Sequence, residues 1–233
     1  MTRAALALAF AGLAAVAPAA DAAPARRAPA GTDWARTVVA TPEGGFRMGN
    51  PAAKVKLVEY GSLTCGHCAA FAKEGMGSLV GSYVKSGKVS YEYRNFVLNG
   101  LDVAATLVAR CGGPSRFFVV ADKLYATQPR WMGRVSALTA QQKAQLNALP
   151  EGQRLGRLAD TVGLTALAAQ HGIAPAQAKR CLEDPAAVDR LGKMAEAAGA
   201  LGVAGTPTFL LNGVNIGTQT WATLEPILRE SAG

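Results

Sequence analysis

The sequence predicts an α/β fold made of a β-α-β unit, a long helical block and a final β-β-α unit. Two strand-like runs with a helical stripe between them fall within residues 54–97. From about residue 101 to 201 the apolar spacing is mostly helical. Strand signals return in "TPTFLLNGVNIG", ahead of a last amphipathic segment.

The first unit opens with "KVKLVEY", residues 54–60. Apolar residues on both faces of this run predict a central strand, with Glu59 on the same face as Val55 and Leu57. An apolar stripe at helical spacing follows up to residue 84, and "VSYEYRNFV", residues 89–97, alternates as a second strand. The unit therefore places "TCGHC" where the first strand passes into its helix.

The helical block is expected to contain five helices. Their predicted ranges are 102–111, 115–126, 154–171, 175–182 and 185–201. Pro175 and Pro185 suit first-turn positions. Residues 129–150 have no clear assignment.

The last unit is predicted from two short apolar runs on either side of Asn212-Gly213, a dipeptide typical of hairpin turns. Residues 220–230 then have the apolar spacing of a helix.

The N-terminus is typical of a secretory signal peptide. A positive start is followed by an apolar run over residues 4–17 and by small residues that suit cleavage. This run is shorter than the roughly 18 apolar residues that span a membrane. We expect residues 1–22 to be a signal peptide, 23–36 to be a flexible lead-in, and the mature protein to be soluble and periplasmic.

Composition is that of an ordinary globular protein with a formal charge of +8. A basic surface could favour acidic partners or an anionic membrane, but solubility is the simpler interpretation. No basic run is interleaved with aromatic residues, so nucleic-acid binding is not expected.

The pair Cys65 and Cys68 admits four interpretations. Attachment of c-type haem requires histidine after the second cysteine, and Ala69 stands there. A structural zinc site needs about four ligands, and the remaining candidates are scattered along the helical block. A purely structural disulfide across two residues would stabilise little. The remaining interpretation is thiol-disulfide exchange.

The predicted position of the pair favours that chemistry. At a helix N-terminus, Cys65 lies among unpaired backbone N–H groups at the positive end of the helix dipole, which favours its thiolate. His67 adds to this effect if it is protonated. Cys68 lies one turn further on, within disulfide reach, so Cys65 is the expected attacking sulfur and Cys68 the resolving one.

"VEYGSLTCGHCAAF" followed far downstream by "GVAGTPTFLLNG" resembles the DsbA-like thiol-disulfide oxidoreductases of the thioredoxin superfamily. The resemblance runs from about Val38 to the C-terminus. It implies a thioredoxin fold with an inserted helical domain, divided into residues 37–100, 101–201 and 202–233.

The resemblance also implies roles for five residues outside the dicysteine motif. Pro207 would be cis, and Thr206 would offer its backbone to an extended substrate segment. An ordinary trans proline is the alternative. Glu59 would handle the proton of Cys68, unless it is a strand-end glutamate that reaches solvent. Cys111 and Cys181 would form a structural disulfide, with two buried free thiols as the alternative.

We therefore expect an exported dithiol oxidase whose catalytic set is Cys65, Gly66, His67, Cys68 and Glu59. Its expected partners are reduced or unfolded exported polypeptides and a membrane, quinone-linked, DsbB-like protein that reoxidises it. We expect a monomer, because the segment before the first strand is too short for a dimerisation domain. No cofactor and no metal are expected.

Two departures from the best-known DsbA pattern keep other activities open. Gly66 precedes His67 where proline is usual, and Thr206 precedes the proline where valine is common. A disulfide isomerase or reductase is therefore an alternative. A redox-silent chaperone or metal carrier on the same fold is another.

Overall fold

The computed structural model describes residues 32–233, and at its centre is a six-stranded mixed sheet in the order β1-β2-β4-β3-β5-β6. The strands are β1 (Val38–Ala40), β2 (Phe46–Gly49), β3 (Val55–Gly61), β4 (Val89–Asn95), β5 (Thr208–Leu211) and β6 (Val214–Gly217). Only β3 and β4 run parallel, and the other neighbours are antiparallel. The connection from β3 to β4 is α1 (Gly66–Ser78), which continues as a π-helical segment, Leu79–Val84.

Both faces of the sheet are covered, as the apolar residues on both faces of β3 predict. On one face, Val55 and Leu57 belong to the main core together with Phe71 of α1. The C-terminal helix α10 (Trp221–Ala232) packs on the same face, where Trp221 meets the Phe71 ring edge-on. On the opposite face, Tyr60 packs in a smaller cluster with Ala198 of α9 (Pro185–Ala200).

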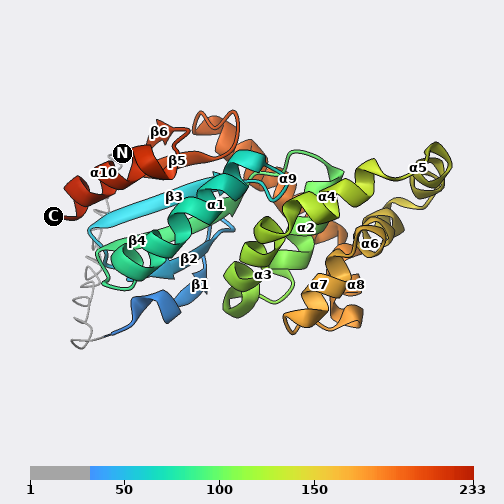
Figure 1. The fold of residues 1–233 in the computed structure, drawn as a ribbon, viewed down its shortest axis with the longest axis horizontal. Coiled ribbons are helices and arrows are strands. Elements are labelled where there is room, and N and C mark those ends of the chain that lie inside the picture. The colour runs from blue at the N-terminus through green and yellow to red at the C-terminus, as the bar shows by residue number, and fades with distance from the viewer. Residues whose placement is uncertain (1–31) are drawn as a thin grey trace, which may run out of the picture.

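The helical block lies beside one end of the sheet, with α5 farthest from it (Figure 1). Before α9 it contains α2 (Gly100–Arg110), α3 (Pro114–Ala126), α4 (Gln128–Ser136), α5 (Ala140–Asn147), α6 (Glu151–Val162), α7 (Leu164–Gln170) and α8 (Pro175–Leu182). The thioredoxin fold with an inserted helical domain is thereby confirmed.

Three local expectations need correction. The helix expected over 154–171 is two helices, because Gly163 adopts a left-handed conformation with φ 84° and ends α6. The unassigned stretch 129–150 forms most of α4 and all of α5. Strands β1 and β2 were not expected, since runs of three and four residues are too short for a clear alternation.

The expected signal peptide, residues 1–22, lies outside the described residues, as does most of the lead-in. The end of that lead-in differs from the expected flexible coil. Trp34–Arg36 form a 3₁₀ turn, and the Trp34 N–H donates to the Lys85 carbonyl at 3.4 Å.

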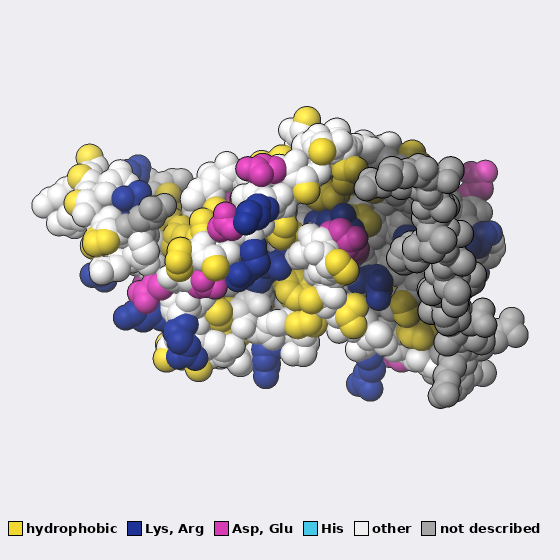
Figure 2. Space-filling model, turned by 180° about the vertical axis from the view of Figure 1, so that it is seen from behind, with side chains coloured by type: hydrophobic (Ala, Val, Ile, Leu, Met, Phe, Trp, Pro, Cys, Tyr) yellow, Lys and Arg dark blue, Asp and Glu magenta, His cyan; other side chains and the backbone are white. Residues whose placement is uncertain are grey.

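The surface shows no single charged region on the face drawn in Figure 2, where Lys and Arg side chains are interspersed with acidic and apolar ones. Within residues 32–233, no helix combines the length and apolarity needed to cross a bilayer.

Candidate functional site

Cys65 is the N-cap residue of α1, at the end of the short segment that connects β3 to this helix. The Cys68 backbone N–H points at the Cys65 sulfur, with N and Sγ 3.5 Å apart. Cys65 is partly exposed, whereas Cys68 is fully buried one turn below it. Both are free thiols, so the structure represents the dithiol form.

The surroundings of Cys65 lower the pKa of its thiol to about 5. The largest cause is the hydrogen bond from the Cys68 side chain, and burial acts in the opposite direction. The Thr206 side chain and the backbone N–H groups of Cys68 and His67 lower the pKa further. Cys65 is therefore a thiolate at neutral pH, as expected of a cysteine at a helix N-terminus.

Cys68 has the opposite electrostatic environment. Burial is the largest cause that raises its pKa far above the usual range, and hydrogen bonding to Cys65 and the charge of Glu59 act in the same direction. At neutral pH Cys68 therefore holds its proton while Cys65 does not.

Glu59 is buried beneath the cysteine pair, with 2% of its surface exposed, and does not reach solvent as a strand-end residue would. The Tyr91 hydroxyl donates to Glu59 Oε2 at 2.5 Å. Burial raises the pKa of Glu59 to about 8, more than the Tyr91 hydrogen bond lowers it, and the Cys65 charge raises it further. The carboxyl group is mainly protonated at neutral pH.

The loop before β5 faces the cysteine pair. The Thr206–Pro207 peptide bond is cis, and the Cys65 Sγ lies 3.2 Å from the Thr206 carbonyl oxygen. The Thr206 hydroxyl oxygen is buried. This places the loop directly beside the reactive sulfur.

Gly66 and His67 occupy the first turn of α1 and are exposed. A Cβ at Gly66 would meet no atom within 4 Å, so the entry to Cys65 is open on that side. His67 contributes to the Cys65 environment through its backbone.

A clamp that the sequence did not predict holds the segment that leads into the motif. Asp102 in α2 is fully buried and accepts from the N–H groups of Leu63 and Leu98, at 2.9 and 3.0 Å. Gln128 in α4 donates to the carbonyl oxygens of Leu63 and Cys65, at 2.8 and 3.0 Å. Asn99 caps the start of α2 by accepting from the Asp102 N–H. This spacing could mark the helix start in the sequence, but it does not reveal the contact between Asp102 and Leu63.

The second cysteine pair lies within the helical block. Cys111 at the end of α2 and Cys181 in α8 are joined by a disulfide, with their Cα atoms 5.8 Å apart. The Gln177 side chain donates to the Cys111 carbonyl at 3.0 Å, next to this bond. The bond therefore links α8 to the helix that carries Asp102.

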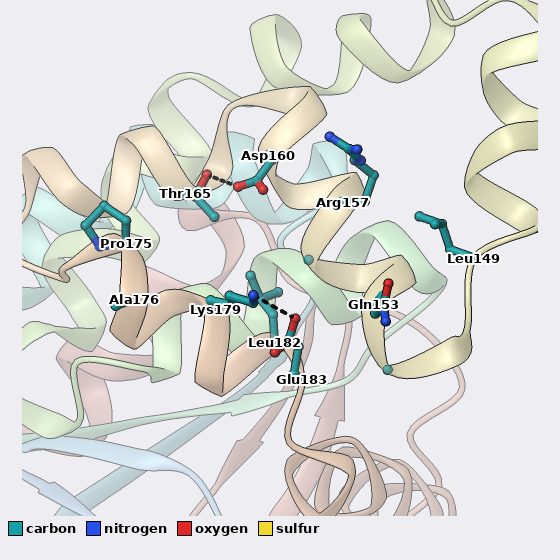
Figure 3. Close-up of a pocket in the computed structure, with 12 residues that line it drawn as sticks. Leu149, Gln153, Arg157, Asp160, Thr165, Pro175, Ala176, Lys179, Leu182 and Glu183 are labelled. Carbon is teal, nitrogen blue, oxygen red and sulfur yellow. Dashed lines mark hydrogen bonds and ion pairs between the residues drawn. The ribbon is translucent and has the colours of Figure 1, made fainter.

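The helical block also contains a cleft of about 830 Å³ between α6 and α8 (Figure 3). Two pairs of its polar side chains interact: Thr165 donates to Asp160 at 2.6 Å, and Lys179 lies 3.9 Å from Glu183. The cysteine pair and Pro207 do not line it. Over residues 32–233, no group of three or more His, Cys, Asp or Glu side chains is arranged to hold a metal ion.

Comparison with known proteins identifies the class. Residues 41–230 match the family model described as thioredoxin, and the chain belongs to that family. Within it, the resemblance to DsbA-like thiol-disulfide oxidoreductases is confirmed.

Several solved structures share the fold. The protein-disulfide isomerase from Novosphingobium aromaticivorans is 33% identical, with a TM-score of 0.75, over 82% of this chain and 98% of that one. α-DsbA1 from Wolbachia pipientis is 20% identical, with a TM-score of 0.65, over 84% and 94%. At 20% identity, the similarity to α-DsbA1 shows only that the two proteins share a fold.

Curated relatives include a Rickettsia conorii protein that carries the provisional name protein-disulfide oxidoreductase. It is 27% identical over 179 residues, which are 76% of this chain and 56% of that protein. The chain thus spans about half the length of the curated relatives it matches.

Proposed function

We propose that the protein is a dithiol oxidase that introduces disulfides into exported polypeptides through Cys65 and Cys68. The observation that carries the proposal is the contrast within the pair. Cys65 is partly exposed and has a pKa of about 5, while Cys68 is buried and holds its proton. A stabilised Cys65 thiolate favours the dithiol form of the enzyme and therefore an oxidising potential.

The reaction starts from the disulfide form. A substrate thiolate attacks the Cys65 sulfur, the Cys65–Cys68 bond breaks, and Cys68 leaves with the bonding electrons and takes up a proton. A second substrate thiolate then attacks the substrate sulfur of the mixed disulfide. Cys65 leaves as a thiolate, so the substrate loses two electrons and the enzyme gains them. The dithiol described above is the product of this sequence.

Glu59 is the proposed source of the proton for Cys68. Its carboxyl group is mainly protonated at neutral pH, is buried, and interacts with Cys68 electrostatically. A protonated group at this position lets the buried sulfur leave as a thiol, which avoids a second buried anion.

Thr206 and Pro207 are the proposed substrate-binding residues. Proline lacks an N–H, so Pro207 cannot complete strand pairing inside the protein. The Thr206 carbonyl lies 3.2 Å from the Cys65 sulfur, which suits backbone pairing with an extended substrate segment that brings its thiol to Cys65.

Turnover requires an electron acceptor that returns the dithiol to the disulfide. We assign this role to a quinone-linked membrane protein of the DsbB type, and we place the enzyme in the periplasm as a monomer. The apolar N-terminal run supports export.

The test is oxidation of a reduced, unfolded two-cysteine protein with catalytic amounts of enzyme and glutathione disulfide as oxidant. Cys65→Ser should abolish catalysis, and Cys68→Ser should abolish it as well, because neither variant can form the Cys65–Cys68 disulfide. The paired Cys111→Ser and Cys181→Ser variant is the matched control and should remain active. A Cys65→Ser protein with unchanged activity would instead support a redox-silent chaperone.

Disulfide isomerisation is the second candidate, favoured by the name of the Novosphingobium neighbour. The two activities separate on a protein with four scrambled cysteines. An oxidase accelerates disulfide formation in the reduced protein but leaves the scrambled one largely unchanged. An isomerase restores the native pairing from the scrambled form.

A further inference from the structure

A second cavity, of about 470 Å³, lies between α1 and α3, against the sheet. Met48 of β2 and Tyr91 of β4 contribute to its lining from the sheet, and Met76 contributes from α1. Its size is that of cavities that hold small organic molecules.

The walls of this cavity are mainly apolar. Phe117 is fully buried, Ala121 is 5% exposed, and both belong to the main core. Val119, also part of the lining, is 51% exposed and is one of the few large apolar side chains that face solvent. An apolar side chain of this kind beside an opening suits the entry of an apolar molecule.

Apart from the exposed pair Asp122 and Lys123, the polar side chains of the lining are few and buried. Glu59 lines the cavity and accepts the Tyr91 hydroxyl. Tyr93 and Tyr125 also line it, and their hydroxyl oxygens lie 2.7 Å apart. A small number of buried polar groups in an apolar cavity can fix the orientation of a ligand that carries one hydroxyl or carbonyl group.

The charges of the lining argue against an ionic ligand. Besides Glu59, the charged lining residues are Asp122 and Lys123, which form an exposed ion pair at 2.9 Å. An anion would meet no unpaired cation among these lining residues, and a cation would meet a carboxyl group that is mainly protonated at neutral pH. Transfer of an unpaired charge into such a site is costly.

We propose that the cavity between α1 and α3 is a binding site for a compact, uncharged alicyclic or aromatic molecule that carries one hydroxyl or carbonyl group directed at Glu59 and Tyr91. The site is distinct from the Cys65 surface where a polypeptide substrate would pair, and binding to it does not require the proposed oxidase activity.

The test uses adamantylmethanol as probe and adamantanecarboxylate as its charged counterpart. Binding is followed by NMR on full-length protein with labelled methionine methyl groups. Saturable shifts are expected for Met48 and Met76, which line the cavity, whereas Met132 and Met194, which do not, serve as internal references. The carboxylate would lose its solvation and find no cation to pair with. It should therefore bind about tenfold more weakly than the alcohol, or worse.

A matched pair of glycine variants tests the location. Gly77 lines the cavity, and a Cβ there would meet no atom within 4 Å. Gly133, in α4, is also helical and open, and does not line the cavity. Gly77→Leu should fill the space and reduce the affinity for the alcohol by about tenfold or more. Gly133→Leu should bind the alcohol with the affinity of the unchanged protein. Both variants should fold and retain disulfide exchange.

Three results would overturn the proposal. They are the absence of saturable shifts at Met48 and Met76, equal binding of the carboxylate, and unchanged binding by a folded Gly77→Leu protein. A protein that binds the alcohol but does not catalyse oxidation would contradict only the oxidase proposal.

Discussion

Two cysteines three residues apart acquire opposite acidities because they occupy different environments. Cys65 is at the N-terminus of α1, where N–H groups and the Cys68 thiol stabilise a thiolate. Cys68 is buried one turn on, where desolvation and the nearby Glu59 disfavour a charge. The positions of the two cysteines in α1 therefore make Cys65 the attacking sulfur and Cys68 the resolving one.

Removing the Cys68 thiol should raise the pKa of Cys65. The hydrogen bond from Cys68 is the largest cause that lowers this pKa, so Cys68→Ala should move it upward from about 5. Cys68→Ser keeps a donor at that position and should move it less. The ultraviolet absorbance of the thiolate, followed against pH, measures both. An unchanged pKa in Cys68→Ala would show that the helix N-terminus alone sets it.

Glu59 should make the protein less stable as the pH rises. The pKa of a glutamate in the unfolded chain is near 4.5, whereas that of Glu59 in the folded protein is about 8. Between these values the folded state binds more protons, so stability falls with increasing pH. Relative to wild type, Glu59→Gln should gain on the order of 4 kcal/mol in free energy of unfolding between about pH 5 and pH 8.

Urea unfolding of the reduced proteins across this pH range measures the difference. The lowered pKa of Cys65 acts in the opposite direction, since stability from a depressed acid increases as pH rises above its folded pKa. Most of that contribution is common to both proteins, so their difference reports on Glu59 together with its interaction with the Cys65 charge. Parallel stability curves would mean that Glu59 is ionised in the folded protein at neutral pH.

At the scale of elements, the redox motif depends on helices that follow it in the sequence. The segment from Ser62 to Cys65 is held by Asp102 of α2, by Tyr125 of α3, whose hydroxyl donates to the Ser62 carbonyl at 3.1 Å, and by Gln128 of α4. The inserted helices therefore hold the segment that leads into Cys65, and the loop with Thr206 and Pro207 contacts the Cys65 sulfur.

Asp102→Ala should loosen this segment. The substitution leaves the N–H groups of Leu63, which is buried, and of Leu98 without their acceptor, at a cost of about 2 kcal/mol in free energy of unfolding. Asp102→Asn keeps one carbonyl oxygen and should cost less. Denaturant unfolding gives the free energies, and the rate of Cys65 alkylation reports on the loop. Equal stability of the alanine variant and wild type would contradict the clamp.

The sequence predicted the elements whose signal is local. The alternation in β3 and β4 and the Asn212-Gly213 turn between β5 and β6 are properties of consecutive residues. The short strand β2 is stabilised by pairing with β4, and β1 by pairing with β2. Gly163 ends a helix whose apolar stripe continues beyond it. Such features depend on contacts or backbone angles that the residue pattern does not contain.

The same distinction applies to the candidate site. Cys65, Cys68 and Pro207 could be identified from short motifs. The buried position of Glu59 followed from its place on an apolar strand face. Asp102 and Gln128 could not be found in this way, since their partners lie 39 and 65 residues away along the chain.

At the scale of the whole molecule, the Cys111–Cys181 bond closes a loop with a sequence separation of 70 residues, within the helical block. In the chain-entropy model a loop of this size contributes about 4 kcal/mol. The paired Cys111→Ser and Cys181→Ser variant should lose up to that amount of unfolding free energy while its redox pair still exchanges. Denaturant unfolding and the oxidation assay measure the two effects. A fully active variant of unchanged stability would show that the bond does not stabilise the fold.

The central claim is that the environments of Cys65 and Cys68 make their disulfide an oxidant. The most direct test is the reduction potential of this couple, measured by equilibration with glutathione buffers in the paired Cys111→Ser and Cys181→Ser protein. The stabilised Cys65 thiolate predicts a value well above that of thioredoxin and shifted towards that of DsbA, about −120 mV. A value near that of thioredoxin, about −270 mV, would contradict the claim and make the protein a reductant.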